Sequence, residues 1–146
     1  MIDLVNHEAR YIAHLNRQMM KLLEAELAPL ELGPGRYLYL FSLYIRDGRR
    51  QQELADTIGV DKAAATRAIS RLEQNGYVRR RADPNDRRSM RVYLTAKGRR
   101  LQPQLEAAAK HCIDNMTREL DGHERVELRR LLEKMASPLI RANQSE

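Results

Sequence analysis

The sequence has few of the residues that support aromatic cores, disulfide frameworks or membrane spans. Its 146 residues include no Trp, one Phe and six Tyr, so its core must be mainly aliphatic, which favours helices. The single cysteine, Cys112, excludes an internal disulfide framework. No apolar run approaches the ~20 residues of a membrane-spanning helix, and the N-terminus lacks a basic region followed by an apolar segment. These absences predict a single globular protein of the cytoplasm.

Motifs of the common enzyme classes are also missing. The sequence has no glycine-rich phosphate loop, no nucleophile motif, and no carboxylate pair placed with a histidine in a recognisable arrangement. An enzyme is therefore not expected, and no catalytic residue, metal or cofactor is predicted.

Positive charge is concentrated in the middle third of the chain. The net charge is +6, and residues 49–100 hold 14 Lys and Arg against six Asp and Glu, whereas the remaining residues hold 12 against 14. A basic segment between neutral or acidic segments is typical of a module that faces nucleic acid.

Hydrophobic spacing predicts two helices in the N-terminal part. Apolar residues recur at threes and fours from Leu4 to about Leu27, as on the buried face of an amphipathic helix. The segment LAPLELGPG then interrupts the pattern, and the second helix, in GRYLYLFSLYIRD, is predicted to stop near Gly48.

Two further helices are predicted at the C-terminal end. Thr95 is expected to cap a helix that runs to Leu120, with a kink over 99–103 because a proline removes an intrahelical hydrogen bond. Asp121 and Glu124 form a capping-box variant that begins the last helix. The residues that this helix is predicted to bury are Leu128, Leu131, Leu132, Met135 and Leu139.

The segment RRQQELADTIGVDKAAATRAISRLEQNGY predicts a helix-turn-helix. Two short helices are joined tightly at Gly59-Val60-Asp61, where Asp61 suits the N-cap of the second helix and Gly76 its end. The buried faces are predicted from Leu54, Ala55 and Ile58 in the first helix and from Ala65, Ile69 and Leu72 in the second.

The second of these helices leaves a polar, basic surface outside its buried stripe. An Arg on such a surface can read guanine in the major groove, and Thr and Ala methyl groups can contact thymine. The alternative is a solvated helix face. The residues predicted to face the major groove are Lys62, Ala63, Thr66, Arg67, Ser70 and Arg71, with Gln74 on the same surface.

An arginine-rich β-hairpin is predicted after Gly76. Its strands cover about 77–81 and 89–94, where Met90, Val92 and Leu94 alternate with polar residues, and its tip covers 83–88. A two-helix unit followed at once by such a hairpin is the arrangement of a winged helix, whose hairpin reaches the minor groove. The residues predicted to contact phosphates are Arg50, Gln52, Arg79 and Arg91.

The stretch from Glu53 to Leu101 resembles the MarR family of bacterial and archaeal transcriptional regulators. The most specific parts are TRAISRLEQNGYV, DPNDRR and LTAKG. The resemblance implies a mainly α fold with a small β-hairpin wing (α+β), in which a winged helix-turn-helix over residues 34–96 is flanked by helical dimerisation regions at 1–33 and 97–146. It also implies a homodimer that binds a pseudo-palindromic operator in double-stranded DNA, with half-sites ~10 bp apart. Repression is the expected outcome of this binding.

In the family, an arginine of the wing enters the minor groove and an aspartate orients it. The matching positions here are Asp86 and Arg88, with Arg87 as the competing arginine. Asp83 and Asp86 would face phosphates at a cost unless nearby arginines pair with them.

The resemblance also raises three kinds of switch. Many members are released by small aromatic acids, and the matching residues here are Tyr11, His14, Arg17, Arg36, Tyr37, Tyr39 and Tyr44, although packing is the favoured role of the tyrosines. Cys112 lies on an apolar stripe, which favours a buried structural thiol over a redox sensor. A zinc switch would need ligands from both chains of a dimer, because the spacings of the soft ligands do not suit a preformed site; these ligands are His7, His14, His111, Cys112 and His123.

Overall fold

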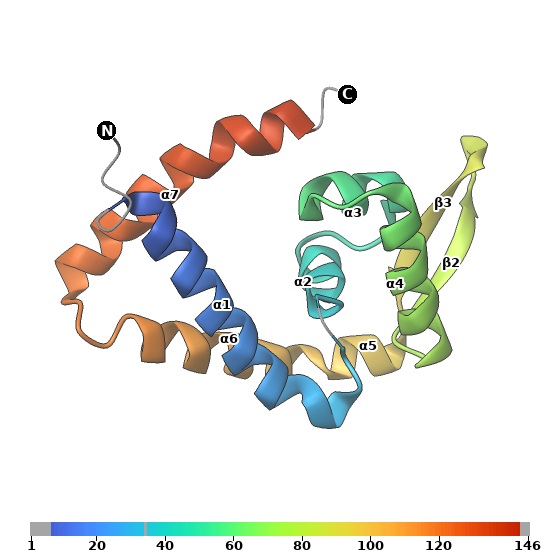
Figure 1. Ribbon diagram of the computed structural model, residues 1–146. Helices are drawn as coiled ribbons and strands as arrows, with labels where there is room; N and C mark the ends of the chain where they lie inside the picture. The colour runs from blue at the N-terminus through green and yellow to red at the C-terminus, as the bar shows by residue number, and fades with distance from the viewer. Residues whose placement is uncertain (1–6, 34, 144–146) are drawn as a thin grey trace.

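The computed structural model describes residues 7–33 and 35–143, and the side chains of residues 7–33 and 35–140. The chain is mostly helical with one small antiparallel sheet, so the predicted fold class is confirmed. Figure 1 shows the long helices α1, α6 and α7 on one side and the winged helix on the other, with α5 between them. Leu4 and Pro34, which the sequence analysis used, lie outside the described residues.

The N-terminal elements match the predicted helices closely. Helix α1 covers Glu8–Leu27 and is followed by a 3-10 turn, Ala28–Leu30. Helix α2 covers Tyr37–Ile45 and ends before Gly48, as predicted.

The helix-turn-helix consists of α3 (Gln51–Ile58) and α4 (Lys62–Gln74). Gly59 adopts a left-handed conformation with φ of 79°, which L-residues with side chains rarely adopt, and it reverses the chain between the two helices. The predicted cap is confirmed, because the Asp61 carboxylate accepts a hydrogen bond from Ala64 N at 2.7 Å.

The wing is a sheet of three strands in the order β1-β3-β2, not a free hairpin. Strand β1 (Arg49–Arg50) joins β2 (Val78–Asp83) and β3 (Asp86–Leu94), pairing with β3 only. Strand β1 was not predicted, because two residues are too few to show an alternating pattern.

The predicted six-residue tip over 83–88 is wrong. The strands extend to Asp83 and from Asp86, so only Pro84 and Asn85 form the turn. Asp83 is buried and bonded at its carboxylate, which keeps it in the strand although aspartate is typical of turns. Met90 is also more exposed than its alternation predicted, because the outer half of β3 projects beyond the body of the protein.

One hydrophobic core joins the winged helix to the base of the flanking helices. Leu54, Ala65, Ile69 and Val92 are fully buried in it, as the helical and strand periodicities predicted, and Leu40 of α2 is fully buried beside them. This core fixes α4 on its inner side and leaves the other side of that helix to solvent.

The C-terminal helices differ from the prediction in their bounds. The predicted kink is a break at Leu101 between α5 (Ala96–Arg100) and α6 (Gln102–Met116). Helix α6 ends four residues before the predicted end at Leu120, since a turn separates it from α7 (Gly122–Asn143). The capping box that begins α7 is confirmed by reciprocal hydrogen bonds of 2.9 Å between Asp121 and Glu124.

The apolar residues of α7 are exposed within this chain, so the prediction that the helix buries them is wrong for the single chain. Their exposed fractions run from 37% at Leu128 to 68% at Leu139. Helix α1 packs along α6 and likewise leaves Tyr11, Ile12 and Leu15 open to solvent. Among the described helices, none has the length and apolar content to cross a membrane.

Candidate nucleic-acid interface

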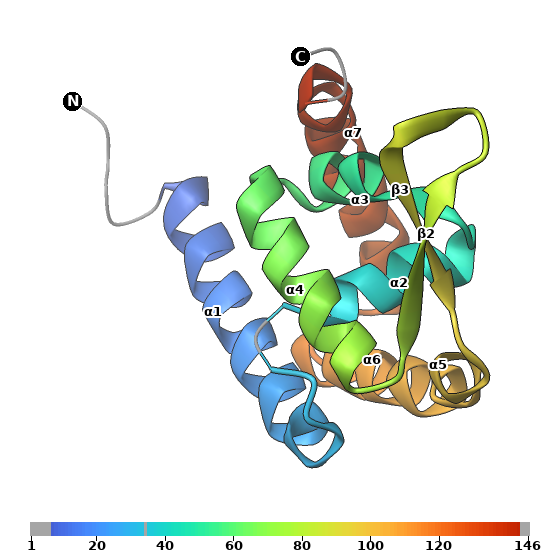
Figure 2. The same ribbon diagram turned by 90° about the vertical axis from the view of Figure 1, so that its right-hand side faces the viewer.

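Helix α4 and the β2–β3 hairpin lie side by side and form one face of the molecule. Figure 2 shows this face toward the viewer, with α4 in front and the hairpin beside it. Because Ala65, Ile69 and Leu72 anchor α4 in the core, the opposite residues of the helix point outward.

The residues predicted to read the major groove lie on this outward side. Lys62, Ala63, Arg67 and Arg71 are exposed, while Thr66 and Ser70 are partly buried. Thr and Ala methyl groups and Arg guanidinium groups are therefore presented together on a convex helix surface, as groove reading requires.

The hydroxyl of Thr66 is held by neighbouring groups. It donates to the backbone oxygen of Lys62 at 2.8 Å, and the Gln51 side-chain amide donates to it at 2.7 Å. This role of Gln51 was not predicted, because no local sequence pattern shows that the first residue of α3 reaches α4. Because both hydrogen bonds occupy the hydroxyl, the methyl group of Thr66 is the part of the side chain that can contact a base.

The wing tip presents two arginines beside a short, fixed turn. The Asp86 carboxylate accepts hydrogen bonds from the backbone N–H of Arg88 at 3.0 Å and from the Ser89 hydroxyl at 2.9 Å. Asp86 thus fixes the backbone that carries Arg88. Arg87 and Arg88 are exposed, and neither forms an ion pair with a described residue.

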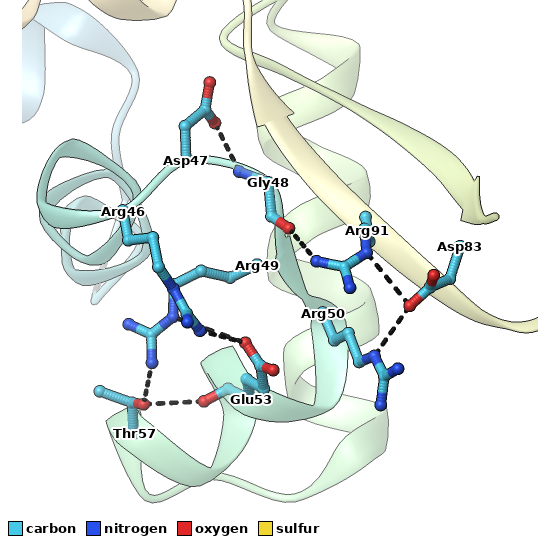
Figure 3. Close-up of polar contacts among 9 residues, drawn as sticks. All are labelled: Arg46, Asp47, Gly48, Arg49, Arg50, Glu53, Thr57, Asp83 and Arg91. Atoms are coloured by element: carbon cyan, nitrogen blue, oxygen red, sulfur yellow. Dashed lines mark hydrogen bonds and ion pairs between the residues drawn. The ribbon is translucent and has the colours of Figure 1, made fainter. Parts of the chain in front are cut away.

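Asp83 is the anchor of the wing. Its Oδ2 atom lies 2.8 Å from Nε of Arg50 and 3.1 Å from Nε of Arg91, so two residues predicted to contact phosphates share one carboxylate (Figure 3). The backbone N–H of Asn85, together with these two guanidinium groups, lowers the pKa of Asp83 below its ordinary value. Arg91 also donates to the backbone oxygen of Gly48 at 2.8 Å.

The remaining arginines of β2 have different surroundings. Arg80 pairs with Glu73 of α4 at 3.1 Å, and its backbone N–H and guanidinium lower the pKa of that carboxyl group. Arg81 lies 6.0 Å from the centre of the Tyr93 ring. Arg79 is exposed and has no ion pair with a described residue.

Figure 3 also shows how the start of α3 is fixed to the segment before it. Arg46 pairs with Glu53 at 2.7 Å, and Arg49 donates to the Thr57 hydroxyl at 2.8 Å. Gln52, predicted to contact phosphate, is exposed and bonded to Asp56 on the same helix.

A cavity of about 290 Å³ lies between the wing and the helix-turn-helix. Residues of β1, α3, α4 and β3 line it, so the fold brings four of the predicted DNA contacts to one groove. These are Arg50, Gln52, Lys62 and Arg88, and the cavity is also lined by Gln51, Ala55, Ala65, Ser89 and Met90.

The residues proposed for an aromatic ligand have different surroundings in this chain. Tyr11, His14 and Arg17 lie in the N-terminal part of α1, where every residue is exposed, and Tyr37 and Tyr39 are buried in the core. The favoured packing role of these two tyrosines is therefore confirmed.

The other two candidates lie apart from that set. Tyr44 donates its hydroxyl to the Gly98 carbonyl at 2.8 Å, and burial raises its pKa to about 12. Arg36 borders an open cavity of about 520 Å³ together with Glu31, Arg71 and Asn75.

Cys112 is buried, as its position on an apolar stripe predicted. Only 2% of the residue is exposed, and burial, followed by the nearby Glu26, raises the pKa of the thiol. The raised pKa disfavours the thiolate that reacts with oxidants. His111 lies against Glu26, and within residues 7–33 and 35–143 no three His, Cys, Asp or Glu residues are grouped to hold a metal.

Comparison with known proteins agrees with this geometry. Residues 32–90 match the model of the MarR family. The HTH-type transcriptional regulator YybA of Bacillus subtilis (strain 168) is 31% identical over 110 residues, which cover 75% of this chain and 73% of the relative.

Solved structures match almost the whole chain. A MarR transcriptional regulator from Methanosarcina mazei Go1 superimposes with a TM-score of 0.88 at 33% identity, covering 92% of this chain and 96% of the other. A mutant MarR from E. coli, complexed with operator DNA, gives a TM-score of 0.80 at 29% identity, covering 92% of this chain and 99% of the other. The three-stranded wing, the capped helix-turn-helix and these similarities together show that the chain belongs to the MarR family of winged-helix, DNA-binding transcriptional regulators.

Proposed function

We propose that the protein is a homodimeric repressor that binds a pseudo-palindromic DNA operator, with α4 in the major groove and the wing in the adjacent minor groove. The observation that carries the proposal is the shared face of α4 and the wing. On it, Arg67 and Arg88 are exposed on two elements that border the same groove.

The exposed apolar residues of the flanking helices support the homodimer. A monomer rarely leaves so many large apolar side chains open to water, and a two-fold axis would let the same surface cover itself. These residues are Tyr11, Ile12 and Leu15 of α1 and Val126, Leu128, Leu131, Leu132, Met135, Leu139 and Ile140 of α7. The operator complex of the E. coli MarR mutant supports DNA as the target.

A selection from random DNA tests sequence specificity. The proposal predicts an enriched palindrome with half-sites ~10 bp apart. A sequence-independent architectural protein, the rival function, would instead bind random duplexes equally well and return no motif.

Two substitutions separate the roles of the helix and the wing. Arg67→Ala should cost about 1–3 kcal/mol of binding free energy and relax the choice of base in the half-site. Arg88→Ala should weaken binding chiefly where A·T-rich sequence flanks the half-site, because a narrow minor groove attracts arginine. Arg129→Ala, on α7, is the control for the loss of one positive charge.

The dimer is tested by the mass of the protein in solution. Replacing Leu132, which is 48% exposed on α7, by Lys should favour the monomer, because the charge would have to be buried in the proposed interface. A monomeric wild type would contradict the proposal.

We also propose a small aromatic acid as the effector that releases DNA, and the bacterial or archaeal cytoplasm as the compartment in which the protein meets its operator. Support for the effector comes from Tyr11, His14 and Arg17, which combine aromatic and cationic groups on the open side of α1. Binding to the DNA upstream of the protein's own gene, with and without a panel of aromatic acids, tests the operator and the effector together. If no acid weakens the complex, the protein is a regulator without this class of effector.

A further inference from the structure

We propose that Asp83 is a positioning residue that fixes the wing to the helix-turn-helix and thereby determines where Arg88 meets DNA. The inference rests on the proposed role of the wing in binding the minor groove. Asp83 is buried and cannot touch DNA itself, but it would control the contact that the exposed Arg88 makes.

The Asp83 carboxylate connects three parts of the winged helix. Oδ1 accepts a hydrogen bond from the backbone N–H of Asn85 in the tip at 3.0 Å. Oδ2 binds Nε of Arg91 in the central strand at 3.1 Å and Nε of Arg50 at 2.8 Å (Figure 3). Since Arg50 is the last residue of β1 and the N-cap position of α3, one side chain links the wing tip to the helix-turn-helix.

The strand order explains why this link matters. Strand β2 pairs with β3 but not with β1, so backbone hydrogen bonds do not connect β2 to the strand that leads into α3. Only two residue pairs, Arg49 with Val92 and Arg50 with Arg91, join β1 to β3. The carboxylate of Asp83 reaches across β3 and adds a side-chain connection where backbone pairing is short.

Burial makes the connection specific. The Asp83 side chain is fully buried, whereas 41% of the Arg50 side chain and 27% of the Arg91 side chain are exposed. A buried carboxylate requires its partners, because an unpaired charge away from water is costly. The strand register also shifts between Ala82 and Asp83, and irregularities of this kind change the direction of a side chain relative to the regular strand.

The link acts on the groove that separates the wing from the helices. Arg88 borders this groove from the wing, and Arg50 borders it from the start of α3. If the wing is already held at one distance from α4, DNA binding does not have to reduce its conformational entropy, and this cost is avoided. A wing without the link would sample several positions and lose part of the contribution of Arg88.

The first test needs no DNA. Hydrogen exchange of the backbone amides of residues 85–90 should become faster in Asp83→Asn, because the tip and β3 lose the shared charge, while the amides of α4 should not change. Asp114→Asn, which removes a carboxylate paired with Lys110 and Arg125 at a distance from the wing, is the control. Unchanged exchange in the wing of Asp83→Asn would overturn the proposal, whatever the protein binds.

The second test is a double-mutant cycle with Arg88→Ala. On an operator with A·T-rich flanks, Asp83→Asn should weaken binding about five-fold or more in the wild-type background and less than about two-fold in the Arg88→Ala background. The preference for half-site bases that α4 reads should not change. An equal loss in both backgrounds, or an equal loss at half-site and flanking bases, would show a general structural role and refute positioning.

Two outcomes separate this inference from the proposed function. If Arg88→Ala alone has no effect, the wing does not read the minor groove, and the exchange experiment then decides the fate of the link by itself. If Asp83→Asn does not fold, Arg50→Gln removes one arm of the link from its exposed end. If Arg50 positions the wing, Arg50→Gln should weaken DNA binding less in the Arg88→Ala background than in the wild-type background. If Arg50 only contacts a phosphate, the two losses should be equal.

Discussion

Replacing Arg79 by Gln removes an exposed guanidinium from β2, whereas its neighbour Arg80 is neutralised by an ion pair with Glu73 of α4. We therefore expect the two adjacent arginines to contribute differently to the salt dependence of DNA binding. A phosphate contact releases counterions, and each contact contributes about −0.9 to the slope of log affinity against log salt concentration.

The size of the effect follows from the number of contacts. One Arg79 in each half of the proposed dimer gives two phosphate contacts, so Arg79→Gln should make the slope about 1.8 shallower. Between 50 and 200 mM salt, the wild type should then lose about 12-fold more affinity than the variant. The measurement is a titration of the selected operator by fluorescence anisotropy at four or five salt concentrations.

The control is a double variant, Glu73→Gln with Arg80→Gln, which removes the ion pair without changing the net charge. Its slope should equal that of the wild type, because a paired guanidinium has little counterion exchange to contribute. Arg129→Gln on α7 controls for the loss of one charge outside the winged helix. If the double variant loses as much slope as Arg79→Gln, or if Arg79→Gln loses none, this division of the arginines is wrong.

Three predictions concern stability. Gly98→Ala should destabilise the fold by about 1–3 kcal/mol or more, because a Cβ there would lie 2.2 Å from the Tyr77 carbonyl oxygen. A Cβ at Gly122 would meet no atom within 4 Å, so Gly122→Ala should be neutral or stabilising. Denaturant unfolding compares the two variants, and equal stabilities would contradict the packing argument. Asp61→Ala removes the cap of α4 and should cost about 1 kcal/mol in the same assay, whereas an unchanged midpoint would mean that the cap hydrogen bond adds nothing. Because folding lowers the pKa of Asp83, the ionised carboxylate stabilises the protein above the ordinary carboxyl pKa, and this stabilisation is lost as the pH falls through the lowered pKa. The melting temperature of Asp83→Asn should therefore fall less steeply with decreasing pH than that of the wild type. An equally steep fall would contradict this assignment.

Local sequence signals predicted most of the winged helix. Asp61 and Gly59 determine the start of α4 and the turn before it through backbone rules that act within a few residues. The hydrophobic period then decides which side of α4 is buried, and so which residues face outward. The same kind of signal predicted the break near Pro103 and the capping box of Asp121.

Contacts between residues far apart in the sequence escaped prediction. Arg50 and Asp83 are 33 positions apart, and their ion pair depends on a two-residue strand that has no pattern of its own. The link from Gln51 to Thr66 likewise depends on how α3 crosses α4. The sequence therefore did not show which arginines of the winged helix are paired with a carboxylate, although it placed them in different parts of the wing.

The sequence by itself determined the helix-turn-helix, the basic hairpin after it and the amphipathic flanking helices, because caps, turns and periodicity act locally. Only the tertiary structure decided which arginines remain available to DNA. Arg50, Arg80 and Arg91 are paired with acidic groups, whereas Arg79 and Arg88 have no such partner among the described residues. The physical reason is that an ion pair depends on distances across the fold, which here are determined by strand order and by the burial of a single carboxylate, Asp83.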